Sequence, residues 1–415
     1  MTRSPAVTRA RTRAECEALD AADPLASYRA EFVVDDDALI YLDGNSLGRL
    51  PKATSDRVQR VLAHEWGSSL IRSWTQSWVD LPRRIGDLIG TGLLGARPGE
   101  VVVADNTTVS LFKAISAAID AAPDRRVLVI ERANFPTDRY VVESLASSRD
   151  LEVRWIPEAG PDPLSVDDLA AVLDESVGVV VLSHVDYRSA ALLDMAALTA
   201  LTRDAGALAV WDLCHSVGAV PIDVRAAQVD VAVGCTYKYL NGGPGAPAFT
   251  YVSLERQRDL RQPIWGWWGR TDMFDMAEGY AARPDIGSWL TGTPGVLSMA
   301  AVEPGVEMVV RAGITAIREK STALTDLAIE LYDAWLADAG VSLQSPRDPQ
   351  QRGSHVTVSH PDAVRIIADM TAAGVIPDFR RPDGIRLGMA ALTTRYVDVY
   401  DGLDVLRAAV SGKSG

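Results

Sequence analysis

Short apolar runs alternate with amphipathic stretches through the first two thirds of the chain, a pattern typical of strands separated by helices. The runs are apolar throughout, so we expect helices to cover both faces of the sheet that they form. This alternation predicts an α/β fold with a mainly parallel sheet flanked by helices. The expected strands are 101–103, 126–130, 151–156, 178–182, 207–211 and 229–234, with a shorter one at 39–42.

The last third of the chain has a different pattern. A long helical periodicity over 296–339 is interrupted only by Pro304 and Gly313. An alternating run at 354–359, an amphipathic stretch near 362–373, a strand over 384–389 and a final helix from Tyr396 predict a smaller C-terminal α+β domain. We therefore divide the chain into an N-terminal arm with a short helix (1–50), a large domain (51–300) and a small domain (301–415).

Polar and aromatic side chains follow the carboxyl ends of the predicted strands. Ligands of open α/β sheets bind at this edge, so these residues are candidates for one site. They are Asn106, Phe135, Asp138, Ser183, Asp212 and Lys238.

Lys238 stands in a Gly- and Pro-rich turn after the apolar run 229–234. A lysine that is partly removed from water can form a Schiff base with a carbonyl, although it can also be a structural lysine beside a turn. Asp212 ends the preceding apolar run, 26 residues earlier, where it could equally cap a helix. Pyridoxal phosphate needs a lysine for its aldehyde and a carboxylate for its ring nitrogen, so the pair together favours this cofactor.

Three stretches carry a family resemblance: 41–48 (YLDGNSLG), 211–221 (WDLCHSVGAVP) and 236–241 (TYKYLN). They resemble kynureninases, which are pyridoxal-phosphate hydrolases of the aspartate-aminotransferase fold (fold type I). The likeness extends from about residue 13 to about residue 406 and implies a large domain built on a seven-stranded sheet.

The resemblance implies roles for individual residues. Lys238 is expected to carry the cofactor and to move the Cα proton, and Tyr237 to contact the cofactor phosphate and donate a proton. Arg386, Trp74 and Asn45 are expected to contact the substrate, with Arg386 on its α-carboxylate. The remaining cofactor contacts implied are Asn106, Thr107, Phe135, Asp138, Ser183, Asp212, His215, Trp267 and Thr293.

Trp267 and Thr293 match positions that family members contribute from a partner subunit, so a homodimer with shared active sites is expected. The Gly- and Trp-rich segment that holds them, 263–294, is long and irregular, as interfacial segments often are.

The expected reaction is hydrolysis of kynurenine or 3-hydroxykynurenine at the Cβ–Cγ bond, which gives anthranilate or 3-hydroxyanthranilate and alanine. Asn106, Arg270 and the stretch from Ala390 to Thr393 depart from the family pattern. They leave a ring-substituted analogue open as the substrate. Another fold-type-I lyase or aminotransferase would share Lys238 and Asp212, and a non-catalytic binding protein of this fold is the alternative from a different class.

Two other interpretations are disfavoured. The run Gly90–Gly95 matches a dinucleotide-binding pattern, but it follows a helical stretch instead of a strand. A cysteine desulfurase would need a mobile catalytic cysteine, whereas Cys214 and Cys235 fall inside apparently buried elements.

Composition limits the partners and the cellular compartment that we expect for this protein. The net charge of −14 is scattered along 415 residues, which argues against a nucleic-acid partner and gives no basic membrane patch. An odd number of cysteines without metal spacing favours reduced thiols in the cytoplasm and no metal site. The first 13 residues hold four arginines and no acid; we expect a frayed tail, with a transit peptide as the alternative.

Overall fold

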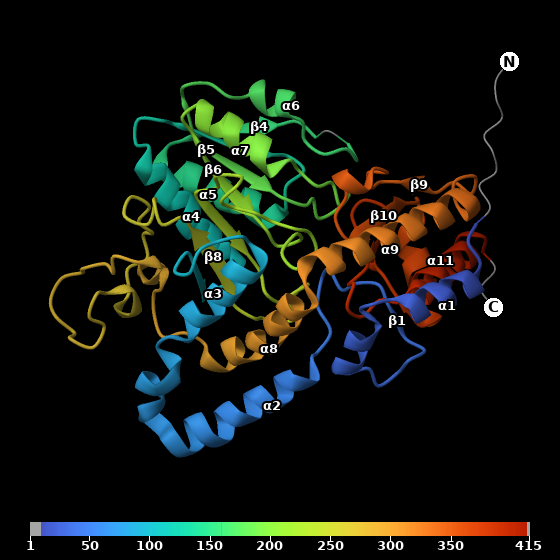
Figure 1. The fold of residues 1–415 in the computed structure, drawn as a ribbon. Helices are drawn as coiled ribbons and strands as arrows, with labels where there is room; N and C mark the ends of the chain where they lie inside the picture. The colour runs from blue at the N-terminus through green and yellow to red at the C-terminus, as the bar shows by residue number, and fades with distance from the viewer. Residues whose placement is uncertain (1–9, 159, 413–415) are drawn as a thin grey trace.

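A seven-stranded sheet forms the centre of the computed structural model, which describes residues 10–158 and 160–412 (Figure 1). The strand order is β2-β8-β7-β6-β5-β3-β4. Only β8 runs antiparallel to its neighbours, so the predicted mainly parallel α/β sheet is confirmed. The strands are β2 (Val101–Ala104), β3 (Val127–Glu131), β4 (Glu152–Ile156), β5 (Val177–Ser183), β6 (Leu208–Asp212), β7 (Val231–Gly234) and β8 (Ala248–Val252).

Strand β8 is absent from the sequence prediction. It follows directly on the Gly- and Pro-rich turn after Lys238, and that turn obscured its start. Its run of aromatic and β-branched residues, Phe249-Thr250-Tyr251-Val252, was the signal that could have located it.

Helices cover both faces of this sheet, as the apolar strands predicted. Alternate residues of each strand enter two separate cores; for example, Val129 faces one core and Leu128 the other. On the first face lie α3 (Leu81–Leu93), α7 (Met195–Asp204) and α8 (Val296–Ala312), with α2 (Lys52–Arg60) outside α8. On the second lie α4 (Thr107–Ala121) and α5 (Pro136–Arg149), while the short α6 (Val166–Ala170) packs against α7.

The C-terminal part forms the predicted smaller α+β unit (Figure 1). Its antiparallel sheet has the order β12-β13-β10-β9 and packs with its helices around a third core. The division of the chain at residues 50 and 300 stays a prediction. The elements are α9 (Ile314–Trp335), β9 (Ser342–Leu343), β10 (His355–Ser359), α10 (Ala363–Ala372), β11 (Val375–Ile376), β12 (Asp378–Arg380), β13 (Gly384–Gly388) and α11 (Tyr396–Val410).

The N-terminal segment packs against this C-terminal unit. Helix α1 (Arg13–Ala22) ends before Pro24 and lies on α11, while β1 (Ile40–Tyr41) pairs in parallel with β11. Cys16 and Leu42 are buried in the same core as α9 and α11. The predicted basic tail lies mostly in residues 1–9, outside the described residues. Within the described part of the chain, no helix is both long and apolar enough to cross a membrane.

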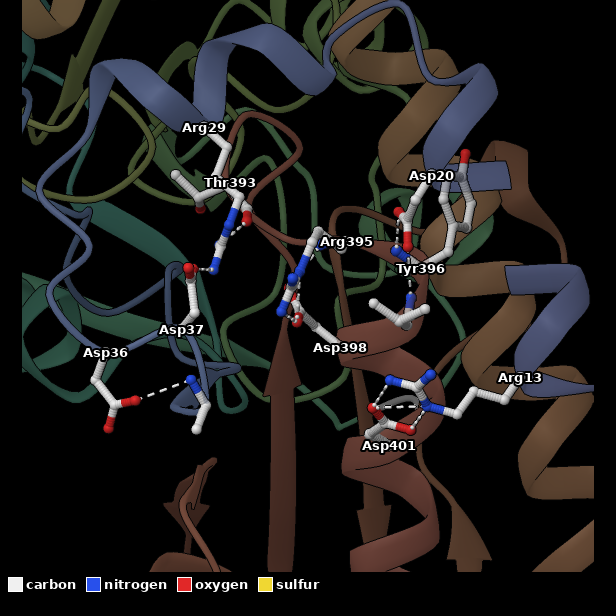
Figure 2. Close-up of polar contacts among 12 residues, drawn as sticks. Arg13, Asp20, Arg29, Asp36, Asp37, Thr393, Arg395, Tyr396, Asp398 and Asp401 are labelled. Carbon is white, nitrogen blue, oxygen red and sulfur yellow. Dashed lines mark hydrogen bonds and ion pairs between the residues drawn. The ribbon is translucent and has the colours of Figure 1, made fainter. Parts of the chain in front are cut away.

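Polar contacts fix α1 against the start of α11 (Figure 2). The Asp20 carboxylate accepts hydrogen bonds from the backbone N–H groups of Tyr396 (2.7 Å) and Val397 (3.0 Å). Arg13 forms an ion pair with Asp401 at 2.8 Å. Asp20 therefore caps, from a distant part of the chain, a helix N-terminus whose free N–H groups favour a negative charge.

We expect Asp20→Ala to destabilise the fold by about 1–2 kcal/mol, because two N–H groups of α11 lose their acceptor. The midpoint of urea unfolding should fall accordingly. Asp404→Ala, which removes an exposed ion pair with Arg407 on the same helix, is the control and should change stability by less than about 0.5 kcal/mol. Equal stability of Asp20→Ala and the wild type would contradict the capping role.

Candidate active site

A cavity of about 200 Å³ lies at the carboxyl ends of the central parallel strands. Lys238, Asp212, Asp138 and Phe135 meet there, although the chain brings them from three different strand ends. The predicted edge of the sheet is therefore where these side chains converge. The cavity is lined by Asn106, Thr107, Thr108, Phe135, Thr137, Asp138, Asp212, Cys214, His215, Tyr237 and Lys238.

The turn after β7 holds Lys238 through its own backbone. Asn241 N–H donates to the Lys238 carbonyl at 3.0 Å, and Gly242 N–H donates to the Thr236 carbonyl at 2.8 Å. Gly48 packs against this turn so closely that a Cβ there would fall 2.3 Å from the Lys238 oxygen. The backbone on both sides of the lysine is thus fixed, and the segment 41–48 is held beside the cavity.

Two buried carboxylates lie near the Lys238 amine. Asp212 accepts a hydrogen bond from Cys214 N–H at 2.8 Å, whereas Asp138 Oδ2 is buried without a hydrogen-bond partner among the described residues. Burial, and then the Asp212 carboxylate, raise the pKa of Asp138 well above its usual value, and the nearby Lys238 opposes this rise. Asp138 therefore has an oxygen available for a bound group.

The surroundings of the cavity also shift the pKa values of His215 and Tyr237. Lys238 Nζ lies 3.3 Å from His215 Nε2. Burial, and then the charge of Lys238, lower the pKa of His215 well below its usual value, so the imidazole is neutral and can accept a hydrogen bond from the amine. Burial raises the pKa of Tyr237, so its hydroxyl keeps its proton at neutral pH.

The N-terminus of α4 borders the cavity. Asn106 caps the helix, because its side chain accepts a hydrogen bond from Val109 N–H at 3.1 Å. The Thr107 hydroxyl lies 3.6 Å from Cys214 Sγ. Backbone N–H groups and hydroxyls at the start of a helix of 15 residues suit an anion such as a phosphate.

Six predicted site residues lie outside this cavity. Ser183 lines a neighbouring cavity with Glu131 and Asp186, and Thr293 lines another beside Asp105. Trp74 contacts the edges of Trp78 and Trp268, and Trp267 packs on Trp268. Asn45 and Arg386 are both fully buried.

Arg386 on β13 is held by groups that the sequence analysis did not identify. One guanidinium nitrogen donates to the Tyr187 carbonyl at 2.8 Å, and another pairs with the Asp378 carboxylate at 2.5 Å and lies 3.6 Å from Asp43. Arg380, which precedes the hairpin turn, pairs with the same Asp378. Asp378 is directly opposite Arg386 in the register of β12 and β13, so the short spacing between these two strands was the signal that could have placed the residues together.

Tyr187 connects this arginine to the cavity. Its ring meets Phe135 edge to face, with 5.1 Å between ring centroids, and Arg380 lies over the same ring. Phe135 lines the cavity, so Tyr187 links the cavity to Arg386: its ring contacts Phe135, and its backbone carbonyl accepts a hydrogen bond from the Arg386 guanidinium.

The donor set of the cavity fits pyridoxal phosphate. It offers a lysine amine, a buried carboxylate with an unpartnered oxygen, a half-buried phenylalanine and a helix N-terminus for a phosphate. Within residues 10–158 and 160–412, no cluster of three or more His, Cys, Asp or Glu side chains could hold a metal ion.

Solved structures with this fold are pyridoxal-phosphate enzymes. The chain is similar to a cysteine desulfurase of Thermococcus onnurineus, with a TM-score of 0.79 at 18% identity over 93% of this chain and 98% of that one. A variant of the cystine lyase C-DES, solved with glycine covalently linked to its pyridoxal-phosphate cofactor, gives 0.79 at 16% identity over 91% and 98%. Fold and cavity together define a fold-type-I pyridoxal-phosphate enzyme.

Sequence similarity identifies the family. The chain is 45% identical to a kynureninase of Burkholderia pseudomallei over 96% of this chain and 95% of the relative, and 43% identical to a kynureninase of Pseudomonas fluorescens over 97% and 96%. Residues 317–406 match the kynureninase C-terminal domain model. The chain belongs to the kynureninase family, and the predicted family and cofactor are confirmed.

The partly buried Asp43 is expected to make the stability of the fold depend on pH. Burial raises the pKa of Asp43 to about 6, against about 3.9 in an unfolded chain. Between these values the folded state binds more protons than the unfolded state, so the carboxylate increasingly destabilises the fold as pH rises from about 4 to about 6.

Asp43→Asn, which removes this charge, should therefore raise the melting temperature at pH 8. The difference from the wild type should shrink as pH falls from 6 toward 4, as measured by thermal denaturation in a pH series. The control is Asp404→Asn on the exposed face of α11, for which no such trend is expected. A pH-independent loss of stability in Asp43→Asn would show that its ion pair with Arg386 dominates.

Proposed function

We propose that the protein is a kynureninase that hydrolyses the Cβ–Cγ bond of L-kynurenine, of 3-hydroxykynurenine, or of both. The products are L-alanine and anthranilate or its 3-hydroxy form. The observation that carries this proposal is the identity of 43–45% to kynureninases over nearly the whole chain. The convergence of Lys238, Asp212 and Asp138 in one cavity supports it independently.

We assign the cofactor contacts from the same cavity. Lys238 holds the cofactor aldehyde, Asp212 accepts a hydrogen bond from the ring nitrogen with Asp138 beside it, and Phe135 packs on the ring. Asn106, Thr107 and Tyr237 hold the phosphate at the start of α4, with support from His215 and, from the neighbouring cavity, from Ser183. When bound, pyridoxal phosphate supplies an electron sink conjugated to the Cα atom of the amino acid.

Individual side chains then have different roles in the proposed reaction. The Lys238 amine moves a proton at Cα, because the neutral His215 beside it can accept its hydrogen bond without competing for positive charge. Tyr237 keeps its proton at neutral pH and is the candidate proton donor. Arg386, Asn45 and Trp74 are the substrate contacts that we propose, with Arg386 on the α-carboxylate.

The side chains do not favour a cysteine desulfurase, although that activity is named for similar folds. A catalytic cysteine must be mobile and exposed enough to ionise. Cys214 and Cys235 are both buried, and the Cys235 thiol donates to the Cys214 carbonyl at 3.7 Å. The hydrogen bond with the Cys235 thiol, and then burial, raise the pKa of Cys214, which keeps this thiol neutral.

The proposed function is tested by a product assay with kynurenine and 3-hydroxykynurenine side by side. We expect anthranilate or 3-hydroxyanthranilate to form together with alanine, and expect Lys238→Ala to abolish both. Release of alanine from cysteine with persulfide, and no turnover of either kynurenine, would overturn the proposal. The ratio of the two kcat/KM values identifies the preferred substrate.

Arg386→Lys tests the carboxylate assignment. A lysine keeps the charge, but its single nitrogen cannot reach Tyr187, Asp378 and a substrate carboxylate together. We expect kcat/KM for kynurenine to fall by about 30- to 1000-fold, equivalent to about 2–4 kcal/mol, while the cofactor absorbance is unchanged.

Arg347→Lys, on the surface and paired with Asp333, is the matched control and should resemble the wild type. Arg380 is unsuitable for this purpose because it shares Asp378 with Arg386. A near-normal kcat/KM in Arg386→Lys would mean that another group binds the carboxylate.

We also propose a cytoplasmic homodimer with composite active sites. Large apolar side chains are exposed on two segments, 62–71 and 264–276; Ile71 is 73% exposed and Trp265 is 67% exposed. The second segment contains Trp267, and the exposed Thr293 follows it, so both could reach a partner's cavity. The three described cysteines, Cys16, Cys214 and Cys235, are unpaired, which suits a reducing compartment.

Mixing two inactive variants tests the shared site. Lys238→Ala removes the amine from its own cavity, and Trp267→Ala removes the side chain offered to the partner, so a hybrid dimer keeps one intact site. We expect partial recovery of activity after subunits are exchanged, and none when either variant is incubated alone. A fully active monomer in sedimentation would refute the proposal.

A further inference from the structure

Three buried polar side chains with unpartnered nitrogen atoms lie on one face of the four-stranded sheet. Among the described residues, neither ring nitrogen of His355 has a hydrogen-bond partner, and the same is true of the Asn45 amide group and of Arg386 Nε. All three side chains are fully buried. His355 has no role in the function proposed above.

The strand register brings these groups together. His355 on β10 is directly opposite Gly388 on β13, and Arg386 points to the same face because it lies two residues before Gly388. The Asn45 amide covers Gly388, where a Cβ would fall 1.7 Å from Asn45 Oδ1. The His355 ring is also 5.9 Å from the ring of His215, which contacts Lys238.

His355 is therefore near His215, which contacts the Lys238 amine, and on the same sheet face as Arg386; this amine and Arg386 are the two groups that would hold the two ends of an amino acid. Buried polar nitrogens without partners are costly, and apolar side chains of the same shape would be neutral or stabilising in their place. Their presence therefore indicates a ligand. Asp378 and Asp43 pair with the arginines of this cluster, but the unpartnered nitrogen atoms include N–H donors, so the expected ligand group is a hydrogen-bond acceptor such as a carboxylate.

Arg386 alone is poorly placed to hold a carboxylate. Its two terminal nitrogens already engage Tyr187, Ser46 and Asp378, which leaves only Nε without a partner. A carboxylate has two oxygen atoms and about four acceptor positions. Further N–H donors are needed, and the unpartnered donors near it among the described residues include the Asn45 amide, the His355 imidazole and Arg380 Nε.

We propose that His355 is a substrate-binding residue, whose ring N–H donates to the α-carboxylate of the amino-acid substrate beside Arg386 Nε and the Asn45 amide. This inference rests on the proposed function, in which Arg386 binds the same carboxylate.

The test compares two probes that differ only in the carboxylate. L-Alanine carries it, and ethylamine is the same amine without it. Both are titrated by calorimetry into the cofactor-loaded wild type and His355→Leu. We expect His355→Leu to bind alanine about 10- to 100-fold more weakly, to bind ethylamine as the wild type does, and to keep or raise the melting temperature.

His355→Gln restores an N–H donor and should recover most of the affinity for alanine. His184→Leu is the matched control, because His184 is also buried with an unpartnered Nδ1 but packs on Trp211, and it should bind both probes normally. If His355→Leu does not fold, His355→Asn, which is polar but too short to reach, is compared in the same way.

Unchanged affinity for alanine, or equal losses for alanine and ethylamine, would overturn the inference. The wild-type product assay separates this result from a failure of the proposed function: an enzyme that hydrolyses kynurenine while His355→Leu binds alanine normally refutes only the role of His355.

Discussion

The burial of one lysine amine among two carboxylates and a neutral imidazole is the constraint on which the site depends. An isolated charge in this position would be strongly disfavoured, and two carboxylates this close disfavour each other's ionisation. Lys238 reduces that repulsion, as its opposing effect on the pKa of Asp138 shows. Burial of these groups is possible only when all of them are present and compensate one another. The strand ends and the helix that supply them must therefore keep fixed relative positions.

Backbone packing around the turn that holds Lys238 fixes these relative positions. Gly48 approaches the Lys238 carbonyl from one side, and Gly305 of α8 is so close to the turn that a Cβ would fall 2.2 Å from the Leu240 oxygen. The N-terminal segment is in turn fixed to the C-terminal unit by β1 and by Asp20. Segments from the beginning, middle and end of the chain therefore meet at one turn, and displacement of any one of them would move the lysine.

Local patterns predicted the large sheet and the cavity but not the surroundings of Arg386. Uniformly apolar strands required helices on both faces, and polar residues after strand ends required a common edge, so Lys238, Asp212, Asp138 and Phe135 could be grouped from sequence. The ion pair of Arg386 with Asp43 depends on how β13 packs against the N-terminal segment, more than 300 residues away along the chain. No periodicity encodes such a contact. Strand β8 was missed for a local reason, since the turn before it obscured its start.

The fold of this protein does not by itself determine the reaction, and the two buried thiols illustrate this point. The chain shares its fold at 18% identity with cysteine desulfurases, yet Cys214 and Cys235 are enclosed by the lysine turn and the end of β6. A buried thiol held in this way lacks the mobility that a sulfur-transferring cysteine needs. The same fold instead presents Arg386, Asn45 and His355 on the face of its small sheet. Because this face comes from the N-terminal segment and the C-terminal hairpin, it can vary while the sheet that bears the lysine stays the same, which is how one scaffold comes to serve different amino-acid substrates.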